Sequence, residues 1–187
     1  MMRHQSPFPA ILMRLVVLAL ALATAACEPI AEPSKPVAAA AEWHEFEGSW
    51  NAAGFRHAIP FGPQRKSSII ELQGTMLLAG PGRPGVGFRA EVIALVDSET
   101  GLAGRSVWTD EHSEQVFSEL KGEGTADRNR ITGTIVGGTG RYAGATGSYE
   151  FSWRFVIESD DGSVQGSTND LKGRIRLGEP SARGSPP

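Results

Sequence analysis

The feature that most constrains the fold is an alternation of apolar and polar side chains, with a period of two, that recurs from Trp43 to Leu177. No segment in this range sustains a helical period, so the alternation predicts strands that bury one face. Short runs rich in Gly, Asp, Asn and Ser separate the strands. Such connections join antiparallel neighbours, because a parallel crossover needs about a dozen residues or more. We therefore expect one all-β domain at residues 43–177.

Eight segments of this domain show the alternation. They cover residues 45–58, 67–78, 87–96, 102–109, 115–125, 130–136, 148–158 and 163–177. Eight sequential antiparallel strands close naturally into a barrel, which removes the unpaired edges that an open sheet would expose. The sequence thus predicts an eight-stranded antiparallel up-and-down β-barrel.

Side-chain parity along these segments separates a lumen face from an outer face. The large side chains that we expect to line the lumen are Trp50, Met76, Phe88, Trp108, Tyr149, Phe151 and Trp153. The same parity places Ile157 inside and places Ile93, Leu95, Phe117 and Val156 outside. The aromatic rings in the lumen either form a wall for a small apolar ligand or simply pack against one another. Packing alone is an alternative because the side chains of an eight-stranded barrel can fill its lumen. Apolar side chains outside indicate a partner or self-association.

A glycine-rich run at residues 137–147, GGTGRYAGATG, imitates the dinucleotide-binding fingerprint G-x-G-x-x-G/A. That fingerprint must open a helix whose first turn receives the phosphates, whereas residues 148–157 alternate like a strand. We therefore interpret the run as a turn between two strands and expect no cofactor. The signature residues of the turn are Gly137, Gly138, Gly140, Tyr142, Gly144 and Gly147.

With its flanking strands, this run reads ITGTIVGGTGRYAGATGSY from Ile131 to Tyr149. It resembles the signature of the allene oxide cyclase and dirigent superfamily, in which such a segment links neighbouring strands of an eight-stranded barrel, and it is similar to bacterial exported proteins with this barrel. Cyclases of the superfamily isomerise an unstable fatty-acid epoxide without a cofactor, and dirigent proteins steer the coupling of phenoxy radicals. The resemblance implies the fold, and no catalytic residue is carried over.

The N-terminus carries an export signal. Basic residues flank the start of an apolar run at 15–26, which is too short to span a bilayer and ends in small residues before Cys27. Thr24-Ala25-Ala26-Cys27 resembles a bacterial lipobox, at which the cysteine receives its lipid, palmitate included, and becomes the mature N-terminus. The alternative is an ordinary signal peptide cleaved near Ala26, which leaves Cys27 as a free thiol.

The resemblance to lipoproteins also implies a location. Glu28 follows the cysteine, which implies sorting to the outer membrane, so we expect a periplasmic protein anchored to the bilayer by lipid at Cys27. The expected layout is a signal peptide at 1–26, the lipidated cysteine with a Pro/Ala-rich tether at 27–42, the barrel, and a disordered tail at 178–187.

Composition limits the remaining functions. A net charge of −3 and a pI near 5.8 exclude general nucleic-acid binding, which needs a basic surface. The four histidines have no metal-ligand spacing, so we expect no metal site. The sequence favours a protein that binds a small apolar ligand or an envelope partner. Two alternatives stay open: a cofactor-free cyclase or isomerase acting in the lumen, and a ligand-free structural module that forms a homo-oligomer.

Overall fold

The structure is a computed structural model that describes residues 42–123 and 130–178. The expected signal peptide, Cys27, nearly all of the tether and nearly all of the C-terminal tail lie outside the described residues. Within the described ranges, no helix has the length and apolar character needed to cross a membrane.

Strands make up almost all of the described chain. They are β1 (His44–Pro60), β2 (Lys66–Ala79), β3 (Gly87–Asp97), β4 (Gly101–Thr109), β5 (Gln115–Gly122), β6 (Arg130–Gly138), β7 (Thr146–Ser152), β8 (Arg154–Glu158) and β9 (Ser163–Arg176). A single turn of 3-10 helix, η1 (Gly140–Tyr142), lies between β6 and β7.

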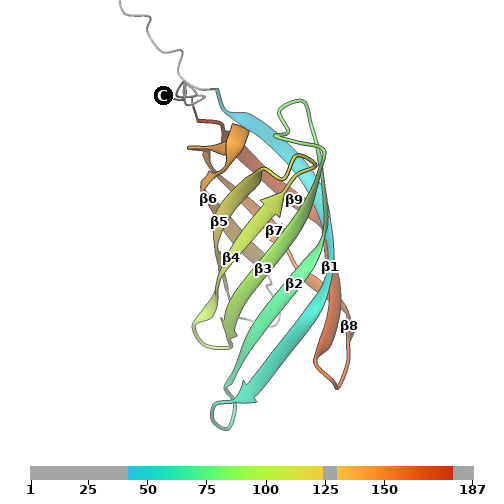
Figure 1. Ribbon diagram of the computed structural model, residues 1–187. Coiled ribbons are helices and arrows are strands. Elements are labelled where there is room, and N and C mark those ends of the chain that lie inside the picture. Colours follow the sequence, from blue (N-terminus) through green and yellow to red (C-terminus); the bar gives the residue numbers. More distant parts are fainter. Residues whose placement is uncertain (1–41, 124–129, 179–187) are drawn as a thin grey trace, which may run out of the picture. The chain divides into compact units, whose positions relative to one another are not determined.

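The strands form a closed antiparallel barrel (Figure 1). Each strand from β1 to β6 pairs with the next, β6 pairs with β7, and β1 pairs with β9 to close the circle. β7 and β8 both pair with β9, so together they occupy one position in the wall. The barrel therefore has eight strand positions, which confirms the fold predicted from the alternation.

The structure corrects the expected seventh strand, residues 148–158. Trp153 interrupts it and separates β7 from β8. A register shift between Phe155 and Ile157 follows, and Ile157 is 48% exposed rather than inside. A bulge inserts a residue and so reverses the parity of the positions beyond it, which is why the prediction for Ile157 is wrong.

Glycines inside the strands make room for aromatic rings in the lumen. A Cβ atom at Gly133 would lie 2.1 Å from the ring of Tyr149, and one at Gly166 would lie 2.5 Å from the ring of Trp153. Since real Cβ atoms do not approach so closely, these positions accept no side chain while the rings stay in place. The rings of Tyr149 and Trp153 thus lie directly against glycines of the barrel wall.

Candidate functional site

One end of the barrel is closed by Tyr142, which η1 carries inward. This closed end also bears the link 80–86 and the turn 110–114. The Tyr142 side chain is fully buried, and its hydroxyl oxygen lies 3.3 Å from the carbonyl oxygen of Pro84. A Cβ atom at Gly85 would lie 3.3 Å from the same hydroxyl. The turn of the glycine run therefore fills this end of the lumen.

Asp110 holds the closed end together. Its Oδ1 accepts hydrogen bonds from the backbone N–H groups of His112 and Glu114, and its Oδ2 accepts from Tyr142 and Arg141. Burial disfavours the Asp110 carboxylate, but these hydrogen bonds outweigh burial and hold the pKa of Asp110 below its ordinary value. Burial raises the pKa of Tyr142 well above its ordinary value. We interpret the cluster as a brace between two turns.

The signature glycines act in two ways. Gly140 and Gly144 have φ angles of 54° and 70°, a conformation that side chains with a Cβ atom rarely adopt. Gly138 and Gly147 instead approach backbone carbonyl oxygens, and a Cβ atom at either would lie 2.2 Å from one. The structure also places Gly137 and Gly138 at the end of β6 and Gly147 in β7, whereas the sequence predicted all three in the turn.

The seven residues expected in the lumen are all buried, each at most 6% exposed. Aromatic contacts form a column through the barrel that starts at Tyr142 and passes through Phe88, Trp108, Tyr149, Phe151, Trp50 and Trp153 to Phe155. The structure divides the predicted set between two halves. Phe88, Trp108 and Tyr149 pack the half near Tyr142, and Met76 is buried in the same core.

The other three, Trp50, Phe151 and Trp153, line a cavity of about 120 Å³ in the opposite half, which we call the open end. The other described lining residues are Ile70, Leu72, Val92, Ala94, Val96, Leu102, Leu120, Gly122, Glu123, Ile131 and Phe155. Glu123 is exposed, so the cavity reaches the surface at this end. Almost all of the described lining residues are aliphatic or aromatic, which suits an apolar ligand.

Two indole groups at this cavity have buried N–H donors. The Nε1 atoms of Trp50 and Trp153 are buried, and neither finds a hydrogen-bond acceptor among the described residues. The two rings lie side by side, with 4.7 Å between their centroids and planes tilted by 44°. A buried donor without a partner costs about 1–3 kcal/mol, so native proteins keep few of them.

The interior hydroxyl groups lie apart from the cavity. Ser106 and Tyr149 share a buried hydrogen bond of 3.0 Å, and neither residue belongs to the lining. Burial raises the pKa of the Tyr149 hydroxyl, which therefore stays protonated. Because neither residue lines the open-end cavity, this hydroxyl pair does not contact a molecule bound there.

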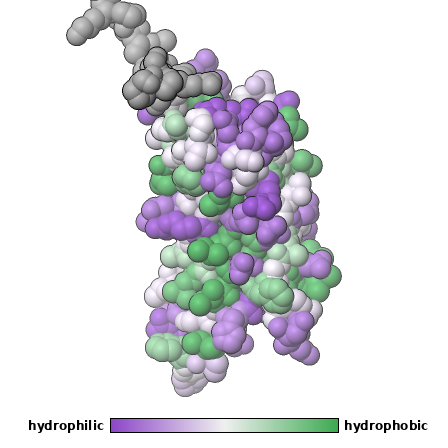
Figure 2. All heavy atoms as spheres, in the orientation of Figure 1, coloured by the Kyte–Doolittle hydropathy of each residue, from purple (hydrophilic) through white to green (hydrophobic). Residues whose placement is uncertain are grey.

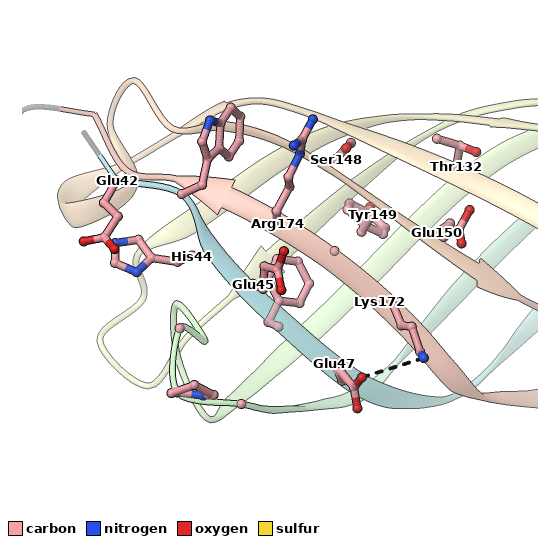
Figure 3. Close-up of a pocket in the computed structure, with 16 residues that line it drawn as sticks. Glu42, His44, Glu45, Glu47, Thr132, Ser148, Tyr149, Glu150, Lys172 and Arg174 are labelled. Atoms are coloured by element: carbon pink, nitrogen blue, oxygen red, sulfur yellow. Dashed lines mark ion pairs between the residues drawn. The ribbon is translucent and has the colours of Figure 1, made fainter. Parts of the chain in front are cut away.

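A larger hollow of about 910 Å³ lies on the outer surface of β1, β7 and β9, beside residues 80–82 (Figure 3). Charges of both signs mix along it, and Glu47 pairs with Lys172 at 3.7 Å. The guanidinium group of Arg174 lies over the ring of Trp43 at 4.8 Å. The hollow neither encloses an apolar volume nor concentrates one charge, so it is a weaker candidate than the open-end cavity.

Among the described residues, one group of side chains comes close enough to share a metal ion: Asp110, Glu111 and His112. Both oxygens of Asp110 already accept hydrogen bonds, and Arg141 forms an ion pair with the same carboxylate. A cation at this place would have to displace the arginine. The donor set therefore does not fit a metal centre.

Comparisons with known proteins do not assign this chain to a family. No family model matches the chain, and no curated protein matches it. Among solved structures, the chain is similar to the pterocarpan synthase dirigent protein, with a TM-score of 0.46 and 10% sequence identity over 80% of this chain and 99% of that one. A similarity this distant carries no argument about activity. The assignment to the class of closed antiparallel barrels rests on the strand pairing itself.

Proposed function

We propose that this chain is an exported, lipid-anchored barrel of the allene oxide cyclase and dirigent type that binds a small apolar ligand in its open-end cavity. One observation carries the proposal: an apolar cavity reaches the surface at one end of the lumen, while Tyr142 fills the other. A ligand then enters and leaves by the same mouth. Burial of its apolar surface against the rings of Trp50 and Phe151 supplies the affinity.

Binding fits the cavity better than catalysis does. An enzyme of the cyclase type needs polar side chains that converge on the substrate, and the described lining contains one titratable residue, Glu123, at the mouth. The hydroxyl pair of Ser106 and Tyr149 lies outside the lining. We therefore place a carrier or sensor of a small molecule ahead of a cofactor-free isomerase.

Native mass spectrometry of the protein extracted from membranes tests the anchor and the ligand together. The expected mature chain begins at a lipid-modified Cys27, and a fraction of it retains a small molecule. A Cys27→Ser variant should leave the membrane fraction. The variant Ala94→Leu fills the cavity and should lose the retained mass, whereas Thr75→Leu on the outer face should keep it. An unmodified Cys27 in the mature chain would exclude the anchor, and equal retention in both variants would exclude the cavity.

The outer face of β1, β2 and β3 favours assembly as a second candidate function. Six large apolar side chains of these strands are exposed. We call four of them the outer cluster, Phe55 (63%), Ile69 (61%), Ile93 (61%) and Leu95 (53%), and the other two are Ile59 and Leu77. Ile69 lies opposite Leu95, and Glu71 lies opposite both Phe55 and Ile93. Figure 2 shows apolar residues gathered on the lower half of the face it presents. Such clusters on soluble proteins often contact a partner.

Sedimentation of the purified chain tests this second function. If the outer cluster joins two copies, Ile93→Lys should shift the protein toward the monomer, because a buried lysine without a partner is costly. Thr75→Lys, on the same outer face but outside the cluster, should leave the equilibrium unchanged. A monomeric wild-type chain at micromolar concentration would rule out self-assembly through this face.

A further inference from the structure

The chemistry of the open-end cavity narrows the class of ligand, on the assumption that the proposed function is correct. Trp50 lies on β1 and Trp153 lies between β7 and β8, yet the fold brings both rings to the same cavity. Both side chains are more than nine-tenths buried, at 2% and 6% exposure. Both N–H groups lack an acceptor among the described residues. Each indole nitrogen is covered too closely for a water molecule to touch it, so an acceptor in the cavity reaches it only after a small turn of the ring. Two unused donors on rings that line one cavity still indicate that an acceptor belongs there.

The lining also restricts the charge of that acceptor. Among the described lining residues there is no lysine, arginine or histidine, and Glu123 stands at the mouth. An anion would lose its hydration in an apolar cavity and gain two neutral donors, while the Glu123 carboxylate repelled it. A cation would find no acceptor beside the indoles. The lining therefore selects a neutral molecule.

The volume limits the size of the part that enters. Apolar cavities of about 150 Å³ in other proteins hold one benzene molecule. At about 120 Å³, this cavity accepts one small ring or a short branched chain, and anything larger extends through the mouth. The ring faces of Trp50, Phe151 and Phe155 offer flat apolar contacts to such a group.

We propose that the open-end cavity binds a neutral molecule whose small ring or branched chain carries a carbonyl or ether oxygen, and that the indole N–H groups of Trp50 and Trp153 donate hydrogen bonds to this oxygen. A carbonyl oxygen has two lone pairs and can accept from both indoles. The aliphatic residues exclude water, and the two donors discriminate a ketone or ether from the hydrocarbon of the same shape.

Cyclohexanone and methylcyclohexane form a matched pair of probes for this proposal. The full chain carries Cys27→Ser, which removes the proposed lipid. The protein then needs no detergent, which could compete for the cavity. Each probe is titrated while the N–H signals of the four tryptophans are followed by ¹H–¹⁵N NMR. Cyclohexanone should move the indole proton signals of Trp50 and Trp153 downfield and leave that of the exposed Trp43 in place. Methylcyclohexane should bind without the downfield shift.

Substitutions then measure each donor. Trp50→Phe and Trp153→Phe should each weaken cyclohexanone binding about three- to tenfold more than methylcyclohexane binding, because one hydrogen bond is lost. Trp43→Phe is the control, since its ring lies outside the cavity and should change neither affinity. If either substitution unfolds the chain, the indole shifts of Trp50 and Trp153 in the chain that keeps both residues decide whether the acceptor proposal holds.

The outcomes separate this inference from the proposed function. If methylcyclohexane binds but cyclohexanone leaves both indole signals without a downfield shift, the acceptor proposal is wrong and apolar binding stands. If both probes lose affinity equally in the two variants, the rings contribute packing alone and the acceptor proposal is again wrong. If neither probe binds the folded chain, both the acceptor proposal and the binding function fail.

Discussion

The Tyr142 hydroxyl donates a hydrogen bond to Oδ2 of Asp110 at 3.2 Å, and so joins the glycine-rich turn after β6 to the turn between β4 and β5. Both side chains are buried, and Asp110 also receives the guanidinium group of Arg141. These contacts join residues 31 and 32 positions apart in the chain, and the buried Asp110 carboxylate relies on both partners at its Oδ2 atom. The closed end of the lumen depends on this contact.

Tyr142→Phe should therefore destabilise the barrel by about 1–2 kcal/mol, because it removes a hydrogen bond to a buried carboxylate while it keeps the ring. Urea unfolding followed by tryptophan fluorescence measures the change. In an Asp110→Asn background the same substitution should cost less, since the two residues act through one contact. Equal costs in the two backgrounds would show that the hydroxyl acts elsewhere.

Stability should fall as the pH falls below about 5. The Ser67 hydroxyl and the backbone N–H of Glu99 hold the pKa of Asp97 well below its ordinary value, and the pKa of Asp110 is also lowered. A lowered pKa in the folded state means that the unfolded chain binds more protons, so the stabilisation is complete above the unfolded pKa near 4 and is lost toward the folded pKa values.

Urea unfolding between pH 7 and pH 2.5 measures this effect. Asp97→Asn should lower stability at pH 7 and flatten the acid slope. Asp160→Asn is the matched control, because Asp160 is exposed and should leave the slope as it is. A wild-type curve that stays level down to pH 3 would contradict the prediction.

Substitutions at Gly144 test how much the backbone conformation of the turn contributes to stability, without a change in packing. Its φ angle is 70°, and a Cβ atom added there would lie 3.6 Å from its nearest neighbour, an ordinary contact. Gly144→Ala should cost about 1–2 kcal/mol from conformation alone, and Gly144→Asn should cost less, because asparagine tolerates this region better. Gly87→Ala is the control, since Gly87 has no positive φ and a Cβ atom there would meet its nearest neighbour, the Leu77 side chain, at an ordinary 3.7 Å. Thermal unfolding ranks the three variants.

Most of the fold follows from local pattern. Alternation along β2, β3 and β4 placed Met76, Phe88 and Trp108 inside, and short turns required antiparallel neighbours, so the barrel could be predicted. The break at Trp153 could not be, because the residues on both sides of it continue the alternation. The bulge beyond it depends on pairing with β9, which is a tertiary contact rather than a local one.

The site was only partly predictable. Parity identified the rings of Trp50, Phe151 and Trp153 as lumen residues, but it does not show which half of the lumen is filled. That depends on Tyr142, which enters the barrel from a turn, where side chains have no strand parity. It also depends on the sum of side-chain volumes in each layer, to which Leu120 of β5 contributes without any distinctive sequence signal.

Two alanines of β3 test this division of the lumen directly. Ala90 and Ala94 both point inward and are at most 6% exposed. Ala94 lines the cavity, whereas Ala90 lies opposite Trp108 in the packed half. Ala94→Val should change stability by less than about 0.5 kcal/mol, because the added methyl groups enter free space, whereas Ala90→Val should cost about 1–3 kcal/mol, because a packed core resists added volume. Urea unfolding compares the two, and equal costs would mean that both halves are filled.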